Sequence, residues 1–299
     1  MPERTDLSGA RSRPDIECGA CRSTAHAAIY RSPRGMVYRC CDCGIFFVDD
    51  AGAEILAQEK LFYSTIDEGR YRVYFERFRS VQYRQVLSRL NLGSGKTLLD
   101  IGASYGWMVR AALDLGLDAY GVEPGDAGCD RDLRERIFRS SLQQYCAIAH
   151  REFDIVTIWH VLEHLRDPVG VLSQMKSLLA KDGVLVVAVP TTDGWMFRLA
   201  LVLKAIGSHK LLYELFYLHN PNMHFFYQNL RSLSTLLERN GFEIMWSDVM
   251  EAFDWTTIWK RAPSPLVSLA LRLLGPFIKL SRFTARENLI IVSRRKEQM

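Results

Sequence analysis

Two pairs of cysteines have the spacing of a metal site. They are Cys18-x2-Cys21 and Cys40-x2-Cys43. Each Cys-x-x-Cys turn directs two thiolates toward one ion, and four thiolates suit tetrahedral zinc. A thiol redox pair or plain surface cysteines are the alternatives. Because four sulfurs leave no open coordination position, we expect this zinc to be structural and not catalytic.

The segment WHVLEHLRDP carries the strongest candidates for acid–base chemistry. His160, Glu163 and His164 are spaced i, i+3 and i+4, which puts them on one face of a helical turn. A neutral imidazole can accept a proton at cellular pH, and His164 is our preferred base. His219 and His224 form a second cluster of candidate residues. The alternative is that these side chains make structural hydrogen bonds or pack in the core.

A glycine-containing loop predicts a nucleotide-like cofactor. The segment LLDIGASYGWMV, residues 98–109, combines a strand, a Gly-x-x-x-Gly turn and the start of a helix. Gly102 permits a sharp turn, and Gly106 permits the close approach of a ligand at a helix N-terminus. Glu123 lies 23 positions after Asp100, at the end of the next predicted strand, where a carboxylate can accept hydrogen bonds from both hydroxyls of a ribose. An adenosine cofactor is implied.

Two classes of cofactor fit such a loop. Dinucleotide binders usually carry Gly-x-Gly-x-x-Gly, in which the middle glycine makes room for a pyrophosphate. Here position 104 is Ser, and Asp100 precedes the first glycine. A carboxylate there repels a pyrophosphate but suits the ammonium and sulfonium groups of S-adenosylmethionine, which we therefore favour over NAD(P).

The elements that position these residues alternate between strands and helices. Strands are predicted at 97–101, 117–123, 153–159, 183–190, 243–250 and 288–295, and helices at 58–90, 106–115 and 168–180. This alternation indicates an α/β fold with a parallel sheet and right-handed crossovers. Between the cysteine pairs, the sequence predicts a hairpin that turns at residues 33–35.

Five segments in order resemble the class I S-adenosylmethionine-dependent methyltransferases, in the small-molecule branch of ubiquinone O-methyltransferases and sugar methyltransferases. They are LLDIGASYG (98–106), YGVEP (120–124), FDIVTIWHVLEHLRDP (153–168), LLAKDGVLVVAVP (178–190) and HFFYQNLRSLSTLLERNGF (224–242). The resemblance implies a seven-stranded, mostly parallel Rossmann-like sheet with helices on both faces. The cysteine pairs are similar to the zinc-binding cap of some bacterial deoxysugar C-methyltransferases.

The resemblance also implies a division into parts. We expect a flexible tail at 1–15, a zinc-ribbon-like domain at 16–50, a helical cap or linker at 51–92 and a methyltransferase domain at 93–299. Apolar insertions interrupt the last of these at 194–218 and 262–283.

Cofactor contacts follow from the same resemblance. The methionine end of the cofactor would be lined by Asp100, Gly102, Ala103 and Gly106. Glu123 would hold the ribose. The adenine would be bordered by Pro124, Ser141 and Leu142. Trp159 and His160 would approach the methyl-bearing sulfur. The resemblance also implies that His224 lies over the acceptor pocket, where it would orient the acceptor or replace His164 as the base. Ubiquinone O-methyltransferases carry a Glu/Glu/His cluster associated with a divalent metal, but the first acid is His160 here, so a catalytic metal is not predicted.

Composition narrows the function classes. The chain has 299 residues, 48% of them hydrophobic, and 38 basic against 34 acidic residues give a net charge of +4. This charge is too low to make nucleic-acid binding the default expectation. The polar N-terminus lacks the apolar core of a secretory signal and no long uncharged apolar span is present, so we expect a cytoplasmic protein.

Two further patterns have both a structural and a functional interpretation. Arginines recur every seven residues between 70 and 84, either as a solvated helix face or as a row that meets phosphates of an anionic acceptor. Tyr71 and Tyr74, on the same helix, either close the acceptor pocket or pack. The apolar insertions either cover the acceptor as a cap, form a dimer surface, or make a weak contact with a membrane surface.

The sequence thus predicts an enzyme that transfers a methyl group from S-adenosylmethionine to a small molecule. We expect the methyl acceptor to be a sugar or a nucleotide-linked sugar in preference to a quinone-like ring. The methyl group could be transferred to an oxygen or to a carbon atom of the acceptor. The alternatives are a non-catalytic zinc- and S-adenosylmethionine-binding module, an NAD(P)-dependent oxidoreductase and an RNA methyltransferase.

Overall fold

The computed structural model describes residues 16–32, 34–49, 68–125, 131–149, 151–218, 223–251, 268–269, 272–273 and 286–296, without the side chains of 68–74. Several predictions therefore lie outside the described residues: the tail at 1–15, His219, the side chains of Tyr71 and Tyr74, and most of the insertion at 262–283.

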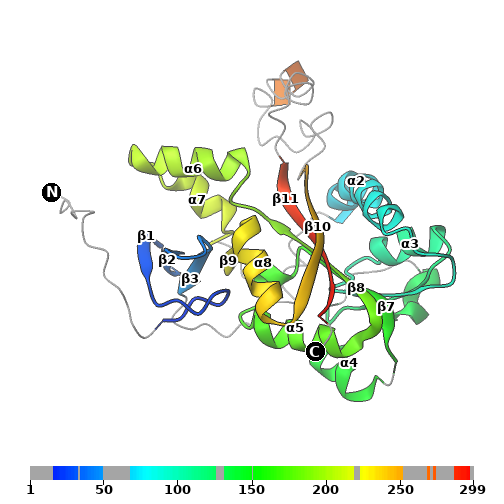
Figure 1. Cartoon of the computed structure of the whole chain (residues 1–299). Helices are drawn as coiled ribbons and strands as arrows, with labels where there is room; N and C mark the ends of the chain where they lie inside the picture. The colour runs from blue at the N-terminus through cyan, green and yellow to red at the C-terminus, as the bar shows by residue number, and fades with distance from the viewer. Residues whose placement is uncertain are drawn as a thin grey trace.

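A seven-stranded sheet forms the centre of the molecule (Figure 1). Its strand order is β10-β11-β8-β7-β4-β5-β6. The strands are β4 (Thr97–Ile101), β5 (Asp118–Val122), β6 (Ile137–Phe138), β7 (Phe153–Trp159), β8 (Leu179–Pro190), β10 (Phe242–Glu251) and β11 (Arg286–Arg295). Only β11 runs antiparallel to its neighbours, β8 and β10, so the predicted mostly parallel Rossmann-like sheet is confirmed.

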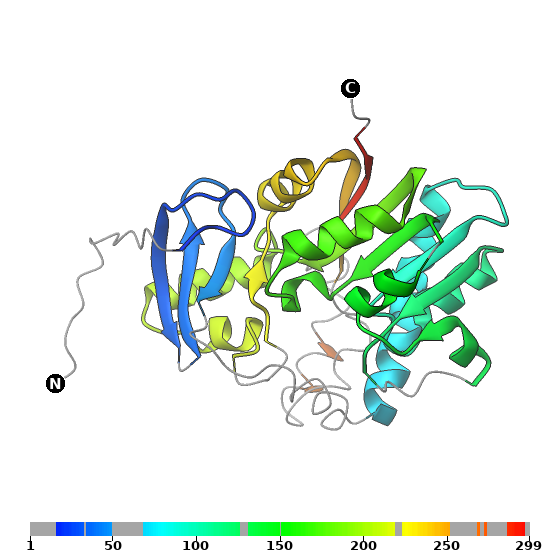
Figure 2. The same ribbon diagram turned by 90° about the horizontal axis from the view of Figure 1, so that it is seen from below.

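Helices cover both faces of this sheet, as predicted (Figures 1 and 2). One face is covered by α2 (Glu68–Arg89) and α3 (Trp107–Asp114), and the other by α4 (Leu142–Ile148), α5 (Pro168–Leu178) and α8 (Leu230–Arg239). Side chains of β4 alternate between the two layers, because Leu98 packs with α2 and α3 whereas Leu99 packs with α5 and α8. Full burial of each such leucine stabilises the fold by about 1.5–3 kcal/mol.

A four-stranded sheet carries the cysteine pairs and lies at one end of the molecule (Figure 2). Its order is β1-β2-β3-β9. The hairpin of β1 (His26–Ser32) and β2 (Gly35–Cys40) turns where the sequence predicted, and β3 (Phe46–Asp49) follows. The last strand, β9 (Phe226–Tyr227), comes from a segment about 180 residues further along the chain.

The first apolar insertion folds as two helices beside this small sheet. They are α6 (Trp195–Ala205) and α7 (Lys210–Leu215). One face of the small sheet packs on α6 and α7, and the other joins the core of α5 and α8. Two short 3-10 helices, η1 (Arg131–Arg136) and η2 (Leu162–His164), complete the described elements.

Candidate active site

The loop between β4 and α3 turns tightly beneath a neighbouring loop. Gly102 and Gly106 have φ of +75° and +84°, a backbone region that strongly favours glycine. A Cβ atom on Gly102 would lie only 2.3 Å from Cγ2 of Val161. The amides of Gly102 and Ala103 both donate to the carbonyl of Val122, at 2.8 and 3.1 Å. The two glycines thus hold the loop close to the sheet edge and against the segment that follows β7.

Glu123 joins two loops at the ends of β4 and β5. Its Oε2 accepts a hydrogen bond from the amide of Ser104 at 2.9 Å, and its Oε1 accepts one from the amide of Gly125 at 2.8 Å. Each carboxylate oxygen has a second lone pair, so these bonds orient the group without exhausting it. The arrangement suits a carboxylate that also accepts hydrogen bonds from ribose hydroxyls.

Asp100 is a buried carboxyl one residue before the end of β4. The hydroxyl of Thr157 on β7 donates to its Oδ1 at 2.6 Å. Burial raises the pKa of Asp100 to about 7, with a further rise from the negative charge of Glu123 and an opposing effect of the Thr157 bond. A nearby cation would favour the ionised form, so the site fits the ammonium group of a bound amino acid.

The predicted adenine contacts flank Glu123. The amide of Glu123 donates to the carbonyl of Phe138 at 3.0 Å, which brings the segment leading to Ser141 alongside it. Ser141 caps α4, because its hydroxyl accepts from the amide of Gln144 at 3.2 Å. Pro124 is exposed and Leu142 is half-buried. The capping bond explains a serine at 141 by itself, so the adenine role of Ser141 stays a prediction.

Trp159 and His160 lie where β7 ends. Trp159 packs edge-on against Tyr83 of α2, with ring centroids 4.8 Å apart. His160 has a φ of +55°, which is costly for a non-glycine residue and is concentrated at functional sites in proteins. Nε1 of Trp159 and Nε2 of His160 are both buried and have no hydrogen-bond partner within the described residues. Buried polar atoms normally have a hydrogen-bond partner, which a bound ligand or a water molecule would supply here.

Glu163, His164 and His224 converge next to this strand end. Their ligating atoms all lie within 4.8 Å of one another, and the two imidazole centroids are 4.7 Å apart. The ring of His160 also reaches this group, with Nδ1 3.2 Å from Oε1 of Glu163. The sequence placed His224 in a separate cluster; the structure joins it to the WHVLEHLRDP residues.

The electrostatics of the cluster favour neutral forms. Burial raises the pKa of Glu163 to about 8 and lowers the pKa of His160 and His224 well below that of free histidine. Nδ1 of His164 lies 3.1 Å from the carbonyl of Met223. A carbonyl only accepts, so Nδ1 of His164 donates this bond. In the neutral imidazole the lone pair is then on Nε2, which is the tautomer that a general base requires.

A segment that the sequence did not assign holds His224 in place. The amide of His224 donates to the carbonyl of Phe216 at 3.0 Å, and the next amide, of Phe225, donates to the carbonyl of Glu163 at 2.7 Å. Strand β9 begins at the following residue and pairs with β3, where Phe226 is opposite Phe47. The aromatic run FFY at 225–227 is the only sequence signal for this strand.

Comparison with known proteins identifies the family. Residues 75–246 match a family model described as "Methyltransferase domain", which is more than half of the chain. The chain belongs to this methyltransferase family.

The chain is 31% identical over 103 residues to a ubiquinone biosynthesis O-methyltransferase of Actinobacillus pleuropneumoniae serotype 7, covering 30% of this chain and 44% of the relative. A second such enzyme, from Glaesserella parasuis, is 28% identical over 36% of this chain and 51% of its own length. The chain thus matches only about half the length of these relatives.

Solved structures show the same fold at low sequence identity. The 1,6-didemethyltoxoflavin-N1-methyltransferase of Burkholderia thailandensis, with S-adenosylhomocysteine bound, is 16% identical and superimposes with a TM-score of 0.53 over 90% of this chain and 98% of that one. With the family model, it confirms the resemblance on which the fold was predicted. The NAD(P)-dependent oxidoreductase alternative has no support from these relatives.

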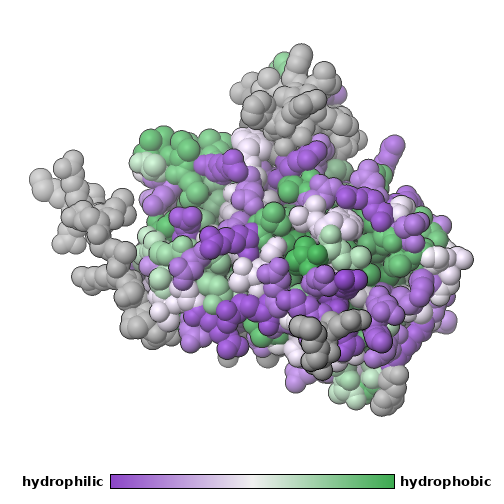
Figure 3. Space-filling view, viewed as in Figure 1, coloured by the Kyte–Doolittle hydropathy of each residue, from purple (hydrophilic) through white to green (hydrophobic). Residues whose placement is uncertain are grey.

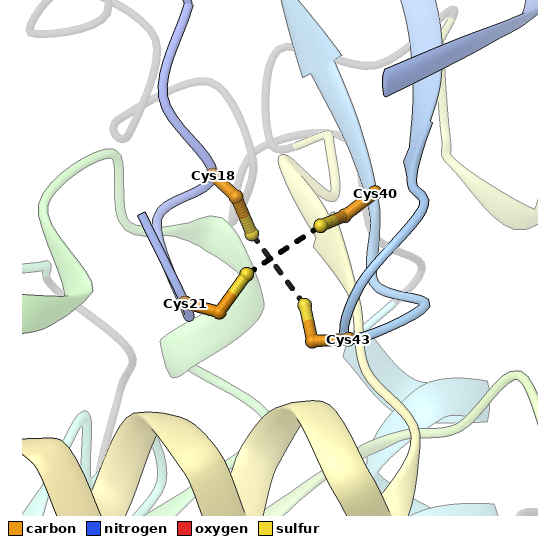
Figure 4. A group of neighbouring side chains, drawn as sticks. All are labelled: Cys18, Cys21, Cys40 and Cys43. Atoms are coloured by element: carbon orange, nitrogen blue, oxygen red, sulfur yellow. Dashed lines mark hydrogen bonds between the residues drawn. The ribbon is translucent and has the colours of Figure 1, made fainter. Parts of the chain in front are cut away.

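The four predicted zinc ligands meet at a second site, beside the methyltransferase domain (Figure 4). Sγ of Cys18 is 3.5 Å from Sγ of Cys43, and Sγ of Cys21 is 3.5 Å from Sγ of Cys40. A disulfide needs about 2.05 Å, whereas two sulfurs on a tetrahedral zinc are separated by about 3.8 Å, given Zn–S bonds of about 2.3 Å. The four cysteines are therefore not disulfides, and their arrangement fits a tetrahedral metal ion. Cys41 is exposed and stands outside the cluster.

The arginines of α2 have two kinds of surroundings: some form ion pairs with neighbouring elements, and one influences the candidate active site. Arg84 pairs with Asp114 of α3 at 2.7 Å, and Arg89, beyond the row, pairs with Asp248 of β10 at 2.6 Å, so both contact neighbouring elements. Arg79 is half-buried, and its charge lowers the pKa of His160 and opposes the rise in the pKa of Glu163. Among the arginines whose side chains the structure describes, Arg79 is the one that these electrostatic effects link to the candidate active site.

Proposed function

We propose that the protein is an S-adenosylmethionine-dependent methyltransferase that acts on a small-molecule hydroxyl. The observation that carries this proposal is the contact between two halves of one site. The glycine loop lies directly against Val161, and the next residues of that segment bring Glu163 and His164 to His224. A cofactor cradle thus adjoins a buried cluster of acid–base groups. The names of the curated relatives support the same reaction class.

The cofactor residues fit S-adenosylmethionine. Gly102 and Gly106 leave the loop without side chains where a ligand would approach, Asp100 would hold the ammonium group, and Glu123 would accept hydrogen bonds from the ribose. When bound, the sulfonium supplies an electrophilic methyl carbon. The protein's task is then to bring an acceptor oxygen into line with that carbon, and positioning of this kind lowers a barrier by about 7–11 kcal/mol.

His164 is the proposed general base, with His224 as its neighbour in the acceptor pocket. Nε2 of His164 carries the lone pair and would take the acceptor's hydroxyl proton as the oxygen–carbon bond forms and the sulfur–carbon bond breaks. Glu163, which is neutral at pH 7, would donate a hydrogen bond rather than repel the developing oxyanion. His160 and Trp159, with buried ring nitrogens, would border the methyl group and the acceptor.

The names of the curated relatives shift the balance among acceptors. The sequence placed a sugar hydroxyl first, whereas these relatives are named as O-methyltransferases of ubiquinone biosynthesis. A ring hydroxyl of low pKa also gives its proton to an imidazole more readily than an aliphatic hydroxyl does. We therefore place a phenol- or enol-like ring hydroxyl ahead of an aliphatic sugar hydroxyl, and oxygen ahead of carbon.

Calorimetric titration with S-adenosylhomocysteine, with NADH as the control ligand, tests the cofactor half. We expect micromolar binding, and we expect Glu123→Ala to weaken it by about 1.5–3 kcal/mol, the scale of charge-assisted hydrogen bonds. Glu238→Ala, at an exposed position of α8, is the matched control. An unchanged affinity for Glu123→Ala would remove the ribose assignment, and no binding by a folded protein would leave a non-catalytic module as the better description.

Turnover with labelled S-adenosylmethionine then tests the acceptor half. Simple catechols and phenols should accept the methyl group, and simple hexoses and nucleotide sugars should not. Methylation of the sugars alone would restore the acceptor order predicted from the sequence.

We also propose that the four cysteines bind one structural zinc ion. Cys18, Cys40 and Cys43 are buried and their sulfurs form a closed set, so the ion would organise this end of the molecule and contact no acceptor. Elemental analysis should find about one zinc per chain. A second equivalent would place a metal on Glu163, His164 and His224 as well and would exclude His164 as the free base.

A further inference from the structure

Helix α6 is apolar on two opposite faces. Its inner face buries Phe197 and Ala200 against β2, β3 and α7. The opposite face exposes four apolar side chains at spacings i, i+4, i+7 and i+11. They are Trp195, Leu199, Val202 and Ile206, which are 40%, 38%, 62% and 77% exposed. A helix that is apolar on both sides is normally buried, so the outer face indicates a partner.

The orientation of α6 is fixed by contacts on its inner side. The carboxylate of Glu287, on β11, accepts a hydrogen bond from the amide of Met196 at 2.9 Å in the first turn of the helix. Phe197 packs edge-on against Phe46 of β3, with centroids 4.9 Å apart. The exposed residues therefore cannot turn inward without breaking these contacts. In Figure 3 apolar surface gathers over α6 and α7.

The charges on α6 and on the turn that follows it have one sign, and the nearest acidic residues in the chain are Asp193 and Glu214, just outside this stretch. Residues 194–213 contain no acidic residue but carry Arg198, Lys204 and Lys210. Arg198 and Lys210 are exposed. An apolar stripe with a tryptophan and flanking basic residues is the pattern of a helix that lies in a membrane interface, with its cations at the headgroups.

We propose that the outer face of α6 docks on an anionic lipid bilayer. The basic residues complement anionic headgroups. No helix in the described part of the chain is long and apolar enough to span a membrane, so the contact is peripheral. A second copy of the chain fits less well, because a two-fold axis would bring the same cations together across the interface. Four side chains also cover far less than the about 800 Å² per partner of a standard protein interface.

The helix that carries the docking face is connected through α7 to the acceptor half of the active site. Helix α7 follows α6, and Phe216 and Tyr217, at its end, contact His224 through a hydrogen bond of 3.0 Å and a ring contact of 4.7 Å. Membrane contact through α6 would thus bring the acceptor residues near the bilayer surface. This proposal does not depend on the methyl-transfer chemistry.

Vesicle flotation of the full chain tests the proposal. The probes are vesicles of phosphatidylcholine alone and vesicles in which part of it is replaced by phosphatidylglycerol. We expect binding to the anionic vesicles that falls at high salt, and a loss of about tenfold or more for Val202→Ser/Ile206→Ser. Arg198→Gln/Lys210→Gln should weaken binding to anionic vesicles only. Ile148→Ser, at a 70% exposed position on α4, is the matched control and should bind as the wild type does.

Circular dichroism and S-adenosylhomocysteine binding verify that each variant is folded, which also separates a failure here from a failure of the proposed function. Wild-type protein that remains unbound to anionic vesicles would overturn the proposal. So would equal binding by Val202→Ser/Ile206→Ser. A concentration-dependent dimer that this double variant abolishes would assign the face to a second copy of the chain instead.

Discussion

The cofactor half and the acceptor half of the candidate site are built in different ways. The cofactor half comes from Asp100, Gly102 and Glu123, which lie within 24 consecutive residues at the ends of adjacent parallel strands. The acceptor half joins η2 to His224, about 60 residues later, and depends on the pairing of β9 with β3. The cofactor half is formed by loops of the large sheet alone, whereas the acceptor half also depends on strand pairing in the small sheet.

This difference implies that the two halves respond separately to perturbation. The small sheet that carries the cysteine cluster is bonded to segments next to the acceptor half. The carbonyl of Cys43 accepts a hydrogen bond from Asn229, the cap of α8, and the amide of Val48 on β3 donates to the carbonyl of Phe225, the residue after His224. No comparable bond in the described residues joins the cysteine cluster to the glycine loop. Damage to the small sheet should therefore affect the acceptor residues first.

The largest expected effect is on turnover when the base is removed. His164→Ala should lower kcat by about 10²–10⁴ and leave S-adenosylhomocysteine affinity nearly unchanged, because the role proposed for His164 is to deprotonate the acceptor and not to hold the cofactor. Steady-state kinetics and calorimetry measure the two quantities. Glu123→Ala is the reciprocal control, with weakened affinity. A loss of cofactor affinity in His164→Ala would show that the two halves are not separate. Normal turnover of this variant would mean that His224 is the base or that the reaction uses no base.

Removing the metal cluster should produce the next largest effect. Cys18→Ser/Cys43→Ser should lose the bound zinc and lower kcat on the order of 100-fold, while S-adenosylhomocysteine affinity changes by less than about threefold, because β9 and His224 lose their support from β3. Cys41→Ser, in the same segment but exposed, is the control and should keep both zinc and activity. Equal losses of cofactor affinity and turnover would show that the small sheet supports the whole molecule.

Much of the cofactor half could be predicted because its signals are contiguous. The strands at 97–101 and 153–159 have the predicted bounds, and alternating strands and helices bring their ends to one sheet edge. The acceptor half was predicted only as two unconnected clusters. A two-residue strand such as β9 has no periodicity, and its pairing with β3 is set by tertiary packing. For the same reason the sequence identified 194–218 as apolar but did not show that α6 has an exposed apolar face.

A substitution in the glycine loop should affect the cofactor half, in contrast to the two changes above, which affect the acceptor half. Gly102→Ala puts a Cβ 2.3 Å from Val161 at a residue with φ of +75°, so the loop must shift. At a strain of about 1–3 kcal/mol, we expect S-adenosylhomocysteine affinity to fall by about 5- to 150-fold. Gly93→Ala, where an added Cβ meets nothing within 4 Å, is the control. Unchanged affinity for Gly102→Ala, measured by calorimetry, would mean that the ligand does not use this turn.

The smallest predicted effect is a pH dependence confined to the cofactor half. The pKa of Asp100 is about 7 in the ligand-free protein, so the carboxylate gains a proton as the pH falls below 7. Only the ionised form attracts the ammonium group of the cofactor, and the affinity must therefore fall with falling pH. Between pH 7.5 and pH 6 we expect a loss of about five- to tenfold, following the ionised fraction. Calorimetry across this range measures it, and Asp100→Asn should bind more weakly with a flat profile. A wild-type profile that is flat, or that rises as the pH falls, would place the ammonium group elsewhere and remove Asp100 from the cofactor half.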